Sequence, residues 1–157
     1  GGLTLFNGTN ADDALDPTRL GLVAARDFAV ASPLAELPKM EVRRLAREQG
    51  LPNWDTAASP CLRSRLQQGV RATAEHMASV ERAEELVRAR LGLRRQENLR
   101  VRLLQGSAGV VEVDAPRLAQ AQGSVGALLE EMRPWGFASL EARAFRSGAL
   151  SLGGTGE

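Results

Sequence analysis

This sequence of 157 residues has few of the side chains that build cross-linked or metal-bound sites, because it contains one cysteine, Cys61, and one histidine, His76. A single cysteine excludes a disulfide framework within the chain. One cysteine with one histidine also excludes the clustered Cys/His sites that hold structural zinc or iron–sulfur clusters. Cys61 is therefore either a small apolar packing residue or a reactive thiol.

Long apolar runs are also missing. Hydrophobic residues make up 43% and charged residues 25% of the chain, as in globular proteins, and no apolar run approaches the ~20 residues that span a bilayer. The first residues, Gly1 and Gly2, provide neither the charged nor the apolar region of a secretion signal. The sequence therefore predicts no membrane segment and a cytoplasmic protein.

An excess of charge of one sign is the third absence. Lys and Arg total 20, Asp and Glu total 19, and every basic residue other than Lys39 and His76 is an arginine. A generic nucleic-acid interface requires positive charge gathered on one face, so this balance argues against a nucleic-acid partner. Local clusters of arginine remain candidates for binding phosphate groups.

Periodicity predicts several regular elements. Leu3–Phe6 resembles the end of a strand, which suggests that an N-terminal portion precedes it. Apolar spacing and turn signals predict helices over 19–28, from Pro38 to Gly50 and from Thr73 to Gly92, a hairpin over 99–113, helical stretches over 117–120 and 125–132, and a strand within 137–145. In the third helix, Glu81, Glu84 and Glu85 are expected to form a solvated face.

The segment 51–72 has no sustained period and carries the cysteine. Long irregular segments inside compact domains are usually functional or disordered. Its apolar residues Leu51, Trp54, Leu62 and Leu66 argue against disorder, whereas the Gly-rich tail 151–157 is expected to be frayed.

Four stretches, in order along the chain, resemble the LarE family of sulfur transferases, which are PP-loop ATP pyrophosphatases. They are Gly8-Thr9-Asn10-Ala11-Asp12-Asp13, Leu51-Pro52-Asn53-Trp54-Asp55, Pro60-Cys61-Leu62-Arg63-Ser64-Arg65 and Arg100-Val101-Arg102, with Arg146-Ser147-Gly148 as a fifth. The resemblance implies an α/β chain in which 1–50 is the remnant of a PP-loop domain, 51–72 is the active-site segment and 73–150 is a small α+β domain for substrate binding and oligomerisation.

The resemblance also implies a reaction. In LarE-type enzymes a pyridinium carboxylate mononucleotide is adenylated with ATP and Mg²⁺, and a sacrificial cysteine then donates its sulfur and becomes dehydroalanine, during assembly of a nickel-pincer cofactor. The Ser-Gly-Gly-x-Asp-Ser loop that grips ATP in that family is missing from this sequence. We therefore expect the chain alone to be unable to adenylate a substrate, and we expect the active form to be a homo-oligomer.

The resemblance assigns roles to particular residues. Cys61 is the expected sulfur donor, and Arg63 and Arg65 are expected to stabilise its thiolate. Because side chains of a strand repeat every second residue, Arg100 and Arg102 share one face, where they are expected to bind the substrate phosphate. Ser64 is expected to donate its hydroxyl hydrogen to the same phosphate. Asn10, Asp12 and Asp13 are expected to bind nucleotide or Mg²⁺. Arg146 is a further expected contact whose partner is less defined.

Structural roles that involve no ligand remain open for these residues. Arg100 and Arg102 could lie on a solvated strand face, the acidic loop could be an ordinary turn, and Arg146 could form a structural salt bridge. Two other functions compete: a PP-loop sulfur transferase that thiolates tRNA, and a non-catalytic module for oligomerisation or docking. The first would require a second catalytic cysteine or a basic face for RNA.

Overall fold

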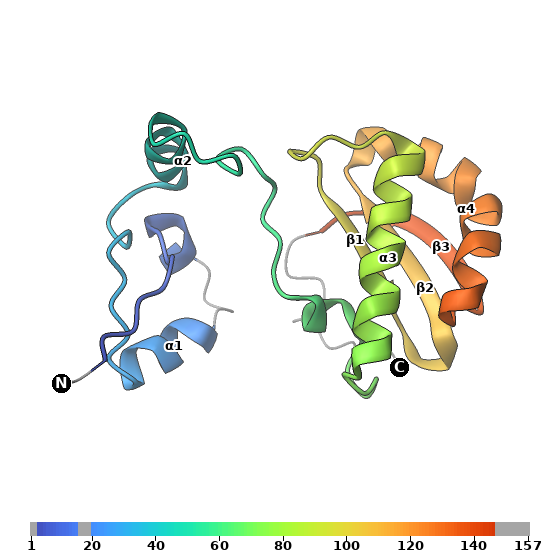
Figure 1. The fold of residues 1–157 in the computed structure, drawn as a ribbon, viewed down its shortest axis with the longest axis horizontal. Helices are drawn as coiled ribbons and strands as arrows, with labels where there is room; N and C mark the ends of the chain where they lie inside the picture. Colours follow the sequence, from blue (N-terminus) through green and yellow to red (C-terminus); the bar gives the residue numbers. More distant parts are fainter. Residues whose placement is uncertain (1–2, 16–19, 147–157) are drawn as a thin grey trace. The chain divides into compact units, whose positions relative to one another are not determined.

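The computed structural model describes residues 3–15 and 20–146 of a mixed α/β chain (Figure 1). It divides into two compact units, Gly1–Asp55 and Thr56–Glu157. The residues around Cys61, from residue 56 onward, therefore belong to the second unit. In the described part of the chain, none of the helices has the length and apolar character needed to cross a membrane.

The first unit contains two helices, α1 (Leu20–Asp27) and α2 (Lys39–Glu48), and a 3-10 turn, η1 (Ala11–Leu15). Both helices were predicted from the sequence. Pro38 precedes α2, where its missing N–H costs no hydrogen bond, and Gly50 follows the helix with a left-handed φ of +68°.

The expected strand at Leu3–Phe6 is wrong for the residues described. This segment makes an isolated parallel bridge between Phe6 and Ala31, flanked by backbone hydrogen bonds from Ala31 and Asn7. A strand requires a hydrogen-bonded neighbour along its length. Within residues 3–15 and 20–55, the pairing of this segment does not extend beyond the bridge to Ala31.

The described residues of the first unit do not form a hydrophobic core. None of those with a described exposure is buried, and large apolar side chains such as Leu3 (97% exposed) and Met40 (83%) face solvent. Among residues whose exposure is described, the large exposed hydrophobic ones all fall in this unit: Leu3, Leu5, Phe6, Val23, Phe28, Met40, Leu51 and Trp54. Helix propensity alone stabilises such short helices poorly. Since none of the residues with a described exposure is buried, these residues gain little stability from packing against one another.

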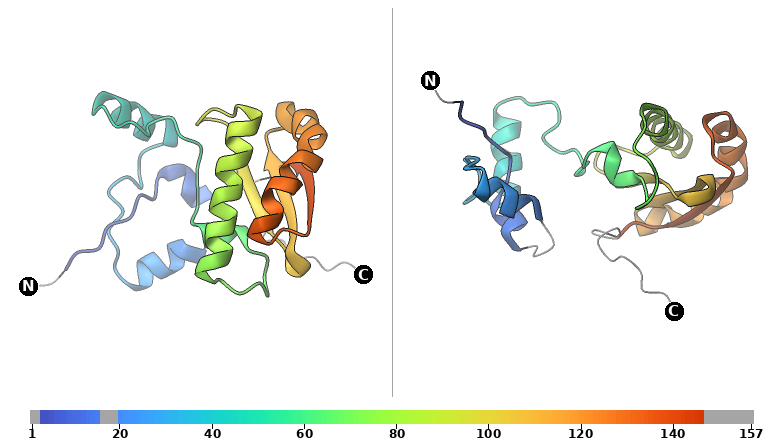
Figure 2. Two further views of the ribbon diagram at one scale, coloured as in Figure 1. Left: turned by 45° about the vertical axis from the view of Figure 1, so that its right-hand side comes forward. Right: turned by 90° about the horizontal axis from the view of Figure 1, so that it is seen from below.

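The second unit is a three-stranded sheet covered on one face by two helices. Its elements are α3 (Ala74–Leu91), β1 (Leu99–Leu103), β2 (Ala108–Val113), α4 (Leu118–Met132) and β3 (Ser139–Ala144), with 3-10 turns η2 (Leu62–Arg65), η3 (Gln105–Ser107), η4 (Ala115–Arg117) and η5 (Arg133–Trp135). The strand order is β1-β2-β3, in which β1 and β2 are antiparallel and β2 and β3 are parallel. Figure 2 shows α3 and α4 on the same side of this sheet.

Local sequence explains the ends of α3. The hydroxyl oxygen of Thr73 accepts the backbone N–H of His76 at 3.1 Å, which is the N-cap interaction expected of threonine. Gly92 ends the helix in the left-handed conformation, with φ +61°. The hairpin of β1 and β2 and the strand β3 are also confirmed.

The two helical stretches expected over 117–132 are one continuous helix, α4. Gly123 and Gly126 lie inside it and weakened the sequence pattern, because glycine is the poorest helix former after proline. The buried residues Ala121, Leu128 and Met132 nevertheless recur on one helical face, so packing against the sheet overrides the glycines.

Alternation along the strands gives the sheet two different faces. The face toward the helices is apolar, and its residues pack with α3 and α4 in one cluster. This cluster includes Leu99, Val101, Leu103, Val111, Val113, Val80, Val87, Leu91, Leu128, Met132 and Phe137. The opposite face carries Arg100, Arg102 and Glu112, all less than 10% exposed. Burial of these charged groups means that each needs polar partners.

The distribution of buried residues predicts a sharp difference between two leucines. Leu128→Ala removes a side chain that is 1% exposed and should lower the free energy of unfolding by about 2–5 kcal/mol, since it leaves a cavity in the core. Leu3→Ala should change it by less than about 0.5 kcal/mol, because Leu3 is 97% exposed. Urea denaturation followed by circular dichroism measures both; equal effects would contradict this core.

Candidate functional site

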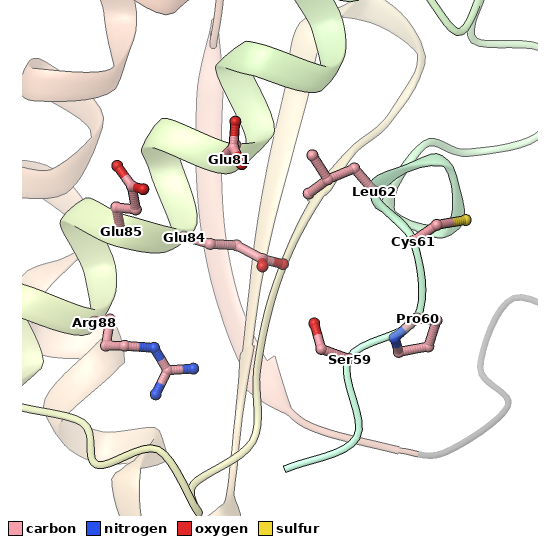
Figure 3. A pocket seen from close by; sticks show the side chains of 8 residues that line it. All are labelled: Ser59, Pro60, Cys61, Leu62, Glu81, Glu84, Glu85 and Arg88. Atoms are coloured by element: carbon pink, nitrogen blue, oxygen red, sulfur yellow. The ribbon is translucent and has the colours of Figure 1, made fainter. Parts of the chain in front are cut away.

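Cys61 is an exposed free thiol at the start of the turn η2. It lines a pocket of about 390 Å³ with Ser59, Pro60 and Leu62, opposite a row of α3 side chains, Glu81, Glu84, Glu85 and Arg88. Figure 3 shows the side chains of Ser59 and Leu62 directed toward α3, whereas the sulfur of Cys61 points away from that helix. The sulfur is therefore not directed at the α3 wall of this pocket.

Arg65 fixes the backbone around this cysteine. Its side chain is 1% exposed, and its Nη1 donates to the carbonyl oxygen of Pro60 at 2.6 Å and to the Oγ of Ser64 at 3.0 Å. Its Nη2 donates to the Oγ of Ser59 at 3.2 Å, and its Nε donates to Glu84 Oε1 at 2.9 Å. The loop thus wraps around one buried guanidinium, whose charge is compensated by a carboxylate.

Glu84 connects that loop to two other elements. It belongs to α3, and its Oε1 also accepts the backbone N–H of Val101, in β1, at 3.0 Å. Its side chain is 19% exposed. One carboxylate therefore joins α3, β1 and residues 59–64 around Cys61, which are called the cysteine segment below.

Glu84 corrects the sequence interpretation, which placed it on a solvated face with Glu81 and Glu85. Glu81 and Glu85 are exposed, but Glu84 is partly buried against Arg65. A signal was available in the helical phase: residue 84 follows Val80 by four positions and precedes Val87 by three, so it lies on the same face as these core residues.

Arg100 and Arg102 lie side by side on one face of β1, as predicted, but they are buried rather than solvated, with exposures of 7% and 6%. Arg100 donates to the carbonyl oxygens of Leu99 and Ala58, and its guanidinium lies 5.4 Å from the ring centroid of Phe145. Arg102 donates to the carbonyl oxygen of Ser64 at 3.0 Å. The two arginines thus hold the cysteine segment on both sides of Cys61; their binding of a substrate phosphate stays a prediction.

Arg102 has a carboxylate partner. Its Nε lies 2.8 Å from Glu112 Oε2, but the geometry is not that of a hydrogen bond, so the contact is an ion pair alone. The other oxygen of Glu112 accepts from Arg143 at 2.7 Å and 3.0 Å. Glu112 is 1% exposed and balances the charge of Arg102 within the sheet.

Two further side chains near Cys61, those of Ser64 and Arg63, donate hydrogen bonds to backbone carbonyl oxygens. Ser64 Oγ donates to the carbonyl oxygen of Cys61 at 2.8 Å, so its hydroxyl hydrogen is directed to the loop. Arg63 is exposed and donates to the carbonyl oxygen of Leu66 at 3.4 Å. Stabilisation of the Cys61 thiolate by Arg63 or Arg65 stays a prediction.

The acidic loop of the first unit forms a turn with its own hydrogen bonds. Asn10 Oδ1 accepts the N–H of Asp12, Asp13 Oδ2 accepts the N–H of Asn10, and Asp12 Oδ2 accepts the N–H of Lys39 at 3.4 Å. The residues expected to bind nucleotide or Mg²⁺ are therefore adjacent, and their role as ligands stays a prediction. Arg146 follows β3 and is exposed; Ser147, Gly148 and the tail 151–157 lie outside the described residues.

Comparison with known proteins places this chain beside a longer protein of similar sequence. The chain is 37% identical over 153 residues to an uncharacterized protein of Synechocystis sp., and the match covers 94% of this chain and 55% of that protein. The chain thus spans about half the length of this relative. No protein-family model matches the sequence.

The link through Glu84 predicts a strong effect of a small change. Glu84→Gln leaves the buried Arg65 guanidinium without its carboxylate, and because breaking a buried ion pair on one side costs about 3–5 kcal/mol, the free energy of unfolding should fall by an amount near the lower end of that range. The partial exposure of Glu84 is the reason for the lower end. Urea denaturation measures the difference.

Glu85→Gln is the matched control, since Glu85 is the next residue of α3 and is exposed. It should change the free energy of unfolding by less than about 0.5 kcal/mol. Equal effects of the two substitutions would show that Glu84 does not compensate Arg65.

Proposed function

We propose that this chain is the sulfur-donating part of an ATP-dependent sulfur transferase of the LarE type, with Cys61 as the sulfur source. The observation that carries the proposal is the placement of Cys61: an exposed thiol on a loop whose backbone is held by a buried arginine. A structural cysteine is usually buried and inert, whereas a nucleophile must be accessible on a well-positioned backbone. The resemblance of Pro60-Cys61-Leu62-Arg63-Ser64-Arg65 to that family supports the same role.

The proposed reaction proceeds in two steps at Cys61. The thiolate attacks the carbonyl carbon of an acyl adenylate, so that a thioester forms and AMP leaves with the electron pair of the broken C–O bond. A base then removes the Cα proton of Cys61, the Cβ–S bond breaks, and a thiocarboxylate leaves. The protein retains dehydroalanine in place of the cysteine and is consumed by one turnover.

The proposal also requires an adenylation step, a sulfur acceptor and contacts to nucleotide or magnesium. Adenylation requires ATP and Mg²⁺ bound by a PP-loop, which this sequence does not contain, so that step is assigned to another part of the protein or to another chain. The proposed acceptor is a pyridinium carboxylate mononucleotide, an intermediate in nickel-pincer cofactor assembly. Within the chain, Asn10, Asp12 and Asp13 are the proposed contacts to nucleotide or magnesium.

A second candidate function is supported by the first unit. Its exposed apolar side chains, such as Leu3, Phe28 and Met40, favour association with another polypeptide surface, as expected of a docking or oligomerisation module. This candidate requires no chemistry at Cys61. Modification of the cysteine therefore discriminates between the two functions.

Intact-protein mass spectrometry tests sulfur donation. We expect the complete protein, including any sequence that flanks this chain, to lose ~34 Da when it is expressed in cells that make the pincer precursor, because loss of H₂S converts Cys61 to dehydroalanine. Peptide mapping should place the loss at residue 61, and Cys61→Ser should abolish it. An unmodified Cys61 in protein that adenylates the substrate and releases the thiolated product would rule the mechanism out.

A further inference from the structure

The carbonyl oxygen of Cys61 accepts three hydrogen bonds. The backbone N–H of Ser64 donates to it at 3.0 Å, the hydroxyl of Ser64 donates at 2.8 Å, and Nη1 of Arg65 donates at 3.4 Å. The backbone bond is the one that the 3-10 turn η2 makes by itself. The side chains of Ser64 and Arg65 therefore add donors that the turn does not require.

Arg65 also polarises the hydroxyl of Ser64. Its Nη1 donates to Ser64 Oγ at 3.0 Å, and that hydroxyl donates its own hydrogen to the Cys61 carbonyl. Hydrogen bonds linked in a chain strengthen one another, and a charged donor at the start of the chain is stronger than a neutral one. Glu84 accepts from Arg65 Nε at 2.9 Å and balances its charge, so Arg65 acts on Ser64 at contact distance rather than through a long-range field.

The Cys61 carbonyl oxygen is also an atom on which negative charge develops during release of the sulfur. A base, hydroxide or a carboxylate, takes the Cα proton of Cys61, and the electron pair of the C–H bond moves onto the carbonyl oxygen as an enolate. That pair then returns to form the Cα–Cβ double bond. The Cβ–S bond breaks, and its electron pair leaves with the sulfur as a thiocarboxylate.

We propose that Ser64 is a catalytic residue of this elimination, because its hydroxyl and its backbone N–H stabilise the enolate oxygen of Cys61. Arg65 is a positioning residue that holds and polarises the Ser64 hydroxyl. Donors that are fixed in place before charge appears stabilise it without the cost of reorganisation, and Arg65 is fixed by its burial and by Glu84. The proposal rests on the proposed sulfur donation, since that reaction is the one that requires an acidic Cα proton at residue 61.

This role differs from the one that the sequence suggested for Ser64. A serine hydroxyl has a single hydrogen, and here that hydrogen is donated to Cys61. Ser64 therefore cannot donate to a substrate phosphate while it holds the Cys61 carbonyl.

The proposal is tested by eliminating the sulfur of Cys61 chemically from the whole 157-residue chain, which contains no other cysteine. 2,5-Dibromohexanediamide alkylates a thiol twice, and base converts the resulting cyclic sulfonium to dehydroalanine. Intact-protein mass spectrometry follows the decay of the sulfonium adduct, so elimination is measured separately from alkylation. In Ser64→Ala the adduct should decay about tenfold more slowly than in the wild type, because the enolate loses one donor.

Two serine variants serve as controls. Ser64→Thr retains a hydroxyl and should restore the rate to within about twofold of the wild type. Ser59→Ala is the matched control, because Ser59 Oγ also accepts from Arg65, at 3.2 Å, but has no described hydrogen bond to the Cys61 carbonyl. It should leave the decay of the adduct at the wild-type rate, and circular dichroism should show that all three variants are folded.

Equal decay in the wild type and Ser64→Ala would overturn the proposal. Equal slowing in Ser64→Ala and Ser59→Ala would also overturn it, since a loosened loop would then be the cause. The wild-type adduct should decay faster in the folded chain than in concentrated urea at the same pH, and equal rates there would overturn the proposal without any variant. The chemical elimination needs neither ATP nor a substrate, whereas sulfur donation is judged by the mass loss in the complete protein, so the two proposals can fail separately.

Discussion

The buried ion pair between Arg65 and Glu84 is the interaction on which the candidate site depends. Removing a guanidinium from water is expensive unless every donor finds a partner, and Arg65, at 1% exposure, finds them in one carboxylate and in oxygens of the loop 59–64. The loop therefore cannot rearrange without exposing or orphaning this charge. Because Glu84 also accepts the N–H of Val101, the constraint reaches the sheet. Cys61 thus sits on an irregular segment that is nevertheless tied to both a helix and a strand.

The two faces of β1 explain why an irregular loop can be held so firmly. Val101 faces the helices and is fully buried in the core, while Arg100 and Arg102 face the other way and donate to carbonyl oxygens at positions 58 and 64. The edge of the strand adds a backbone bond from Gln67 to Leu103 at 2.9 Å. Stability gained by the apolar face is thereby transmitted to the cysteine segment, since the strand that carries the arginines is the one that packs against α3.

The sequence predicted the local features of this structure because their causes are local. Thr73 and Gly92 mark the ends of α3, and alternation around Val101 marks a strand, since capping and side-chain direction depend on nearby residues. The same local pattern misled at Leu3–Phe6, where a strand needs a partner from elsewhere in the chain. Gly123 hid the continuity of α4, which packing supplies. The resemblance singled out Cys61, Arg100 and Arg102, and in the structure the two arginines of β1 donate to carbonyl oxygens on either side of Cys61, at positions 58 and 64.

The candidate site depends on ion pairs between side chains that are far apart in the sequence. Such pairs could not be predicted from local sequence patterns. Arg65, Arg100 and Arg102 are equivalent in sequence terms, as arginines near a cysteine, yet the structure gives carboxylates to two and leaves the third facing a cavity. A compensated guanidinium adds little to the field that an incoming anion meets, so the paired arginines act as structural clamps. Arg100 is 7% exposed, and burial, as the largest cause, lowers the pKa of its guanidinium. Among the described residues, the positions of Glu84 and Glu112, rather than the number of arginines, decide which of the three buried guanidinium groups form ion pairs.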